Sequence, residues 1–82
     1  MNYTIATMKE VHTDFEIAYE KSGNLYNVLI IYRDDDERIM HYNQYENADE
    51  ACKVYLKLAE AIFKGMYSLK DRIAILEGEC RG

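Results

Sequence analysis

Two histidines and two cysteines are the side chains of this sequence best suited to nucleophilic or acid–base chemistry. They are His12, His41, Cys52 and Cys80 in a chain of 82 residues. A catalytic triad needs a nucleophile beside a His that a carboxylate orients, and no Ser, Cys or Asp signature surrounds either His. No second Cys or His lies at ligand spacing from Cys52, which indicates a structural thiol. We therefore predict no catalytic residues and no enzymatic activity.

The run Asp34-Asp35-Asp36-Glu37 has the carboxylate density of a cation site. A calcium loop of the EF-hand type needs spaced ligands, a Gly in mid-loop and a closing Glu, and this run lacks that arrangement. Adjacent carboxylates repel one another, which favours a solvated turn. The four glycines are too scattered for a phosphate-binding loop. The sequence therefore predicts neither a metal site nor a cofactor site.

The overall charge restricts the classes of partner. Asp and Glu number 15 against 10 Lys and Arg, which gives a net charge of −5. Nucleic acids and anionic membranes attract clustered Lys and Arg, so we expect neither as a direct ligand. The likelier class of partner is a protein with a basic surface. The start of the chain lacks the features of a signal peptide and two cysteines make no disulfide framework, so we expect free thiols and a cytoplasmic protein.

Hydrophobic periodicity predicts the elements that position these side chains. Residues 14–20 alternate apolar and polar side chains, which is typical of a half-buried strand. A hairpin at Gly23-Asn24 leads to residues 25–32, a strand that is apolar on both faces and therefore needs cover on each. Residues 38–45 follow the acidic turn as a third strand, which completes a three-stranded antiparallel meander.

Helical spacing begins after the third strand. Asn47 and Glu50 form a capping pair, and the apolar stripe that follows predicts one long helix ending at Gly65 and packed on the sheet. Residues 69–77 fit a short helix or a strand, and residues 3–11 are equally ambiguous, which leaves the role of residues 1–12 open. We predict a single α+β domain over residues 1–82, with a meander sheet, one long helix and a short C-terminal helix or strand.

Tyrosines and acidic residues mark a candidate binding surface. Eight tyrosines occur, most of them in the predicted strands. They suit the sheet core, but they are numerous enough to predict at least one exposed cluster of the kind that anchors protein interfaces. A row of acids beside such a cluster suits a basic groove. The predicted partner-binding residues are Asp14, Glu16, Glu20, Tyr32, Asp34, Asp35, Asp36, Glu37 and Tyr42.

Several segments together resemble the small phage-encoded anti-CRISPR inhibitor proteins. They are the apolar run Val28-Leu29-Ile30-Ile31, the acidic turn, the strand that continues to Tyr45, and the helix from Ala48 to Gly65. Several of these inhibitors are likewise small acidic domains with an antiparallel sheet and one or more helices. The resemblance implies a stoichiometric inhibitor that competes with nucleic acid or guide RNA for a basic channel of a nuclease, such as a CRISPR effector.

Three functional classes are therefore open. The first is a protein-binding inhibitor or an immunity-type protein directed against a toxin. The second is a structural or interaction module, expected to form a homodimer that buries the second apolar face of the sheet, at Leu25, Leu29 and Ile31. The third is an enzyme or small-molecule binder without a recognisable site. If the terminal segments leave that face uncovered, we expect a dimer.

Overall fold

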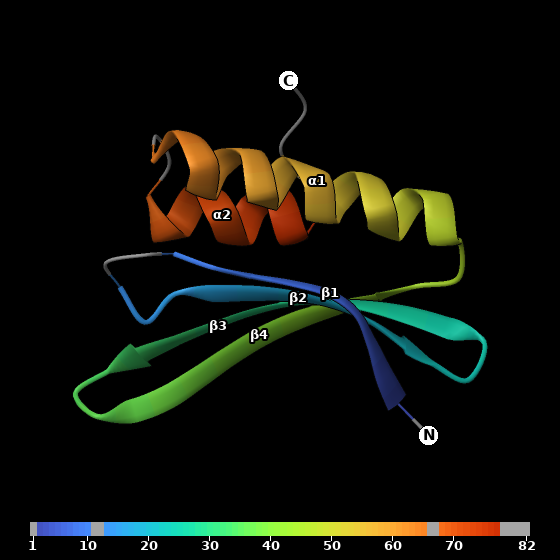
Figure 1. Cartoon of the computed structure of the whole chain (residues 1–82), viewed down its shortest axis with the longest axis horizontal. Helices are drawn as coiled ribbons and strands as arrows, with labels where there is room; N and C mark the ends of the chain where they lie inside the picture. Colours follow the sequence, from blue (N-terminus) through green and yellow to red (C-terminus); the bar gives the residue numbers. More distant parts are fainter. Residues whose placement is uncertain (1, 11–12, 66–67, 78–82) are drawn as a thin grey trace.

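The computed structural model describes residues 2–10, 13–65 and 68–77. These residues form four strands and two helices. Figure 1 shows the strands and the helices as two layers. The chain order is β1 (Asn2–Lys9), β2 (Glu16–Ser22), β3 (Leu25–Asp34), β4 (Glu37–Tyr45), α1 (Ala48–Lys64) and α2 (Leu69–Leu76). The strands form one antiparallel sheet in the order β1-β2-β3-β4. Both helices lie on the same face of this sheet. The α+β class is confirmed.

The sheet has one strand more than the three that the sequence predicts. The additional strand is β1, which pairs antiparallel with β2 from Asn2 opposite Ser22 to Lys9 opposite Glu16. The register shifts between Thr4 and Ala6, which is the mark of a β-bulge. A bulge breaks the alternation of side chains between the two faces, so the period of two that identifies a strand is blurred here.

Two tight turns connect the central strands. Gly23, in the turn between β2 and β3, has a φ of 60°. In the turn between β3 and β4 the two central residues, Asp35 and Asp36, have φ values of 50° and 66°. Positive φ at both central positions is the geometry of a type I′ hairpin turn, and Asp tolerates it better than most residues. The predicted acidic turn is therefore a well-defined hairpin.

The core lies between the helices and one face of the sheet. Ile17, Val28, Ile30 and Leu58 are fully buried there. Asn47 caps α1 by accepting hydrogen bonds from two backbone amides of its first turn, and Gly65 ends the helix at a φ of 62°. For α2, Ser68 and Asp71 form a capping box, which settles the ambiguity of residues 69–77 in favour of a helix over Leu69–Leu76.

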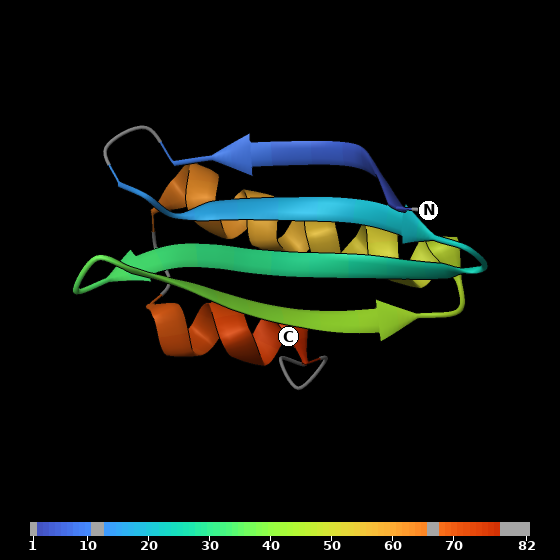
Figure 2. The ribbon, with the colours of Figure 1, turned by 90° about the horizontal axis from the view of Figure 1, so that it is seen from below.

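The second face of the sheet is covered by no helix or strand among the described residues, as Figure 2 shows. The described part of the chain therefore covers one face itself, because β1 extends the sheet at its edge and α2 joins α1 on the other face, and cover of the second face stays a prediction. The uncovered side is called the open face below. It is formed by Thr7, Lys9, Glu16, Ala18, Glu20, Ser22, Leu25, Asn27, Leu29, Ile31, Arg33, Arg38, Met40, Tyr42 and Gln44.

No helix within residues 2–10, 13–65 and 68–77 has the length and apolar character needed to cross a membrane.

Candidate protein-binding surface

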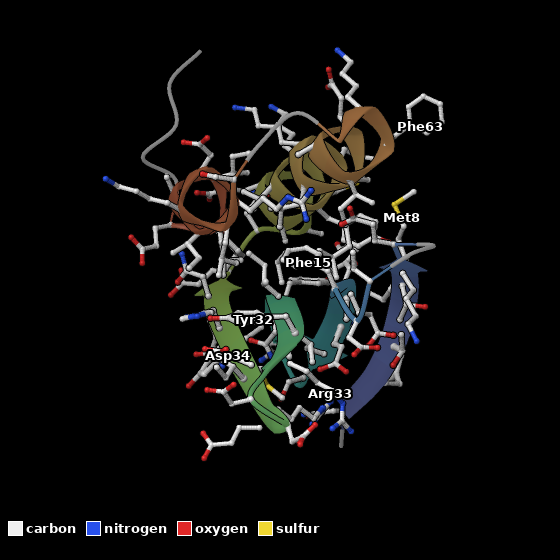
Figure 3. All side chains as sticks on the ribbon, turned by 90° about the vertical axis from the view of Figure 1, so that its left-hand side faces the viewer. Met8, Phe15, Tyr32, Arg33, Asp34 and Phe63 are labelled. Atoms are coloured by element: carbon white, nitrogen blue, oxygen red, sulfur yellow. The ribbon has the colours of Figure 1, made fainter. Side chains whose placement is uncertain are left out.

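Five of the predicted partner-binding residues gather where β3 turns into β4. Asp34, Asp35, Asp36 and Glu37 form the hairpin turn, and all four are exposed. Asp14 lies at the same end, because it precedes β2 by two residues and Glu16 at the start of β2 pairs with Ile31 of β3. In Figure 3 this end of the sheet faces the viewer, and Asp34 is labelled. Asp14 and the residues of the turn are called the acidic end below.

Two basic residues flank the turn, one in β3 and one in β4. Arg33 and Arg38 are opposite each other in the β3–β4 ladder, one residue before Asp34 and one after Glu37. Like charges directly opposite in a sheet repel, and the surrounding carboxylates offset this repulsion. Arg33 Nη1 also donates a hydrogen bond to the backbone carbonyl oxygen of Asp36 at 3.5 Å. Positive charge therefore lies directly beside the carboxylates of the turn.

Tyr32 belongs to the helix-facing layer and is partly buried. Its ring lies nearly parallel to the rings of Phe15 and His41, at centroid distances of 6.4 and 5.8 Å. Its hydroxyl group is 3.3 Å from His41 Nε2. Both partners restrict the Tyr32 ring, so this tyrosine contributes more to the packing of the sheet end than to an exposed aromatic cluster. The other predicted position, Tyr42, is on the open face and is 63% exposed.

Glu16 and Glu20 also lie on the open face. Glu16 is between Lys9 and Ile31 in neighbouring strands, near the end that carries the turn, and Glu20 is next to Asn27, further from it. The predicted alternation of β2 is confirmed, since Ile17 and Tyr19 face the helices. The fold therefore separates the predicted residues into the acidic end, the open face with Glu16, Glu20 and Tyr42, and Tyr32 in the helix-facing layer.

A cavity of about 290 Å³ lies between the acidic end and α2. Phe15, Tyr32 and Leu69 form its apolar part, and Arg72 lies beside them. Arg72 is only 7% exposed. Its Nη1 donates to Glu10 Oε2 at 2.9 Å, and its guanidinium carbon is 4.3 Å from the centroid of the Phe15 ring. Sequence reasoning missed this ion pair, because nothing in the pattern of either segment signals a contact between residues 62 positions apart.

The titration shifts belong to groups with structural roles. Burial raises the pKa values of Tyr19, Tyr45 and Tyr55 above 10.0. Tyr45 also donates a hydrogen bond to the carbonyl oxygen of Leu76, which ties β4 to the end of α2. The neighbouring Lys64 lowers the pKa of Glu60 on the outer surface of α1. These shifts follow from burial between the sheet and the helices and from the ion pair on α1.

Metal-ligating side chains are not clustered in the described ranges. Within these residues, no three His, Cys, Asp or Glu side chains come together where they could hold a metal ion. Cys52 is a half-buried free thiol on α1. His12 and Cys80, two of the four side chains with catalytic potential, lie outside the described residues.

Comparisons of the chain with family models, with curated proteins and with solved structures found no significant match. The resemblance to anti-CRISPR inhibitors therefore stays a prediction from the sequence. The function must be inferred from the two surfaces that the geometry defines, the acidic end and the open face.

Proposed function

We propose that this protein binds a basic surface of another protein through its acidic end and thereby blocks the nucleic acid that this surface would hold. The observation that carries the proposal is the convergence of Asp14 with the turn from Asp34 to Glu37 at one end of the sheet. These residues are exposed and come from two segments of the chain. A compact group of carboxylates resembles in charge the phosphates that a basic channel binds.

The hairpin presents these charges in a fixed arrangement. Asp35 and Asp36 occupy the two positive-φ positions of a tight turn, and Asp34 pairs with Glu37 at its base. Less conformational entropy is lost when such a preorganised turn binds than when a flexible acidic loop binds. Complementary charge also speeds the encounter with a basic partner. The protein would act as a stoichiometric, non-enzymatic inhibitor of the anti-CRISPR kind, with a nuclease as the partner class.

The experiment compares two variants that each lose two negative charges. Asp35→Asn with Asp36→Asn removes two of the five negative charges of the acidic end and keeps residues that accept positive φ. Glu46→Gln with Glu50→Gln is the matched control, because both residues are exposed and lie at the opposite end of the sheet, where α1 begins.

Each purified, immobilised protein is exposed to a nuclease-treated lysate of the source organism, and retained proteins are quantified over a salt series. We expect the unmodified protein and the control to retain the same basic, nucleic-acid-binding protein in stoichiometric amount and to release it as salt rises. The Asp35→Asn/Asp36→Asn variant should lose most of it. Equal retention by both variants would contradict the proposal.

A further inference from the structure

The centre of the open face is an apolar surface that no other described segment covers. Leu29 and Ile31 of β3 lie opposite Tyr42 and Met40 of β4, and these four side chains form two adjacent rows. Tyr42 is 63% exposed and Met40 is 44% exposed, whereas Ile31 is partly buried and Leu29 is 8% exposed. Scattered single apolar residues are normal on a protein surface, but contiguous rows on an uncovered sheet are typical of an interface.

The open face is large enough for a specific dimer. Four strands spaced about 4.8 Å apart and roughly 30 Å long present about 550 Å². Two copies packed face to face would therefore bury about 1,100 Å² in total, above the roughly 1,000 Å² expected of a biological interface and in the range of weak, reversible ones. Inner faces of two sheets pack in this way at a separation of about 10 Å.

Charges on the open face distinguish between the possible orientations of a second copy. Arg33 and Arg38 lie at one end of the apolar rows, whereas Glu20, Asn27 and Gln44 lie at the other. A two-fold axis parallel to the strands would place the arginines of the two copies against each other. An axis perpendicular to the strands exchanges the two ends and brings the arginines of one copy to the polar end of the other.

The second orientation brings opposite charges together. An axis that passes between the two apolar rows stacks Ile31 on Leu29 of the second copy. The same axis places Arg33 over Asn27 of the second copy and beside its Glu20, so the guanidinium can donate to the Glu20 carboxylate.

We propose that a second copy of this chain covers the open face, related to the first by a two-fold axis in the plane of the interface and perpendicular to the strands. The apolar rows form the centre of this dimer, and Arg33 of each copy pairs with Glu20 of the other. The two acidic ends then point in opposite directions and stay exposed. The dimer is therefore compatible with the proposed function but does not depend on it.

The first test is the mass of the protein in solution over a hundredfold range of concentration, by sedimentation equilibrium. We expect a reversible dimer of twice the 9.7-kDa chain mass. Tyr42→Glu should raise the dissociation constant at least about tenfold, since it buries a charge against an apolar row. The control is Phe63→Glu, because Phe63 is 84% exposed on α1, in the other layer. A monomer throughout, or a dimer weakened only by Phe63→Glu, would overturn the proposal.

A charge exchange tests the orientation. Within one copy, Arg33 and Glu20 are about 20 Å apart, because they lie six residues apart along the ladder of β2 and β3, so no contact between them can form inside a monomer. Arg33→Glu and Glu20→Arg should each weaken the dimer at least about tenfold, since each places like charges together. Mixing the two variants should produce a heterodimer, because residues 33 and 20 of the two copies then again have opposite charges.

The charge exchange separates this proposal from the proposed function. Circular dichroism of each variant establishes that it is folded before its mass is measured. Two variants that dissociate alone and associate when mixed would support the perpendicular axis, and failure of the mixture to associate would overturn it. Asp35→Asn with Asp36→Asn should leave the mass unchanged, so loss of partner binding and loss of the dimer are distinguishable.

Discussion

The ion pair between Glu10 and Arg72 holds α2 against the first half of the chain, and Glu10→Gln tests its importance. The substitution removes the carboxylate that lies 2.9 Å from Arg72 Nη1, while the Arg72 side chain keeps its charge at 8% exposure. Loss of one partner from a fully buried ion pair costs about 3–5 kcal/mol. The Glu10 side chain is 26% exposed, so water can replace part of the interaction. We therefore expect the free energy of unfolding to fall by about 2 kcal/mol.

Urea and thermal unfolding followed by far-ultraviolet circular dichroism measure this loss. In a domain of this size about 2 kcal/mol corresponds to a fall in Tm of roughly 8–16 °C. The matched control is Glu60→Gln, which makes the same chemical change in an exposed pair with Lys64 at 2.7 Å and should change stability much less. Glu10→Gln combined with Arg72→Met should recover most of the loss, because the buried charge is removed as well. Equal effects of Glu10→Gln and Glu60→Gln, or no recovery in the double variant, would refute the reasoning.

Three further predictions concern the helix layer. Leu58→Ala removes a fully buried side chain and should lower the free energy of unfolding in urea by about 2–4 kcal/mol, and a loss below about 1 kcal/mol would show that the site collapses around the cavity. Asn47→Ala removes the cap of α1 and should cost about 1 kcal/mol, whereas Asn47→Ser should retain most of the stability, so equal losses would exclude capping as the cause. Burial raises the pKa of Tyr45 above its ordinary value of 10.0, so its contribution to stability is complete below pH 10.0 and is lost as pH rises through the folded-state pKa. Above pH 10.0 the urea midpoint should therefore fall less steeply with pH in Tyr45→Phe than in the unmodified protein. The same slope in both proteins would contradict this role of Tyr45.

Elements with strong local signals could be predicted from the sequence. The stripe from Ala51 to Ile62 predicts α1, and the capping residues Asn47 and Gly65 set its ends as the structure has them. The alternation in β2 predicts which of its side chains enter the core, because burial on one face imposes the period of two, whereas β3 is apolar on both faces and its pattern does not choose between them. The acidic turn is likewise confirmed as a hairpin turn, since Asp residues suit its positive φ values.

Features that depend on contacts between distant segments could not be predicted. The bulge after Thr4 disrupts the alternation by which β1 would be identified. Glu10 and Arg72 meet only because β1 and α2 both reach the same end of the sheet. The sequence also could not predict that one face of the sheet is left uncovered. The apolar pattern of β3 predicts that both of its faces are buried, but it does not predict whether a helix of the same chain covers each of them.

Separation of the predicted binding residues has the same origin. Asp14 and the turn are brought together by the register of β2 with β3, which sequence spacing does not define. Glu16, Glu20 and Tyr42 share the open face, on which Glu20 and Tyr42 lie further from the turn than Glu16, and Tyr32 lies on the opposite face. The sequence suggests a single row of acids beside tyrosines. The structure instead has one charged end and one face that is partly apolar.

The most direct test of the proposed function is competition for the captured partner. Labelled nucleic acid is bound to that protein, and the purified chain is then added in increasing amount, with Asp35→Asn/Asp36→Asn in parallel. We expect the unmodified chain to displace the nucleic acid with an end point of one chain per binding site, and the variant to displace little at the same concentration. A complex that holds partner, nucleic acid and chain together, or equal displacement by the variant, would contradict the conclusion that the acidic end occupies the basic surface.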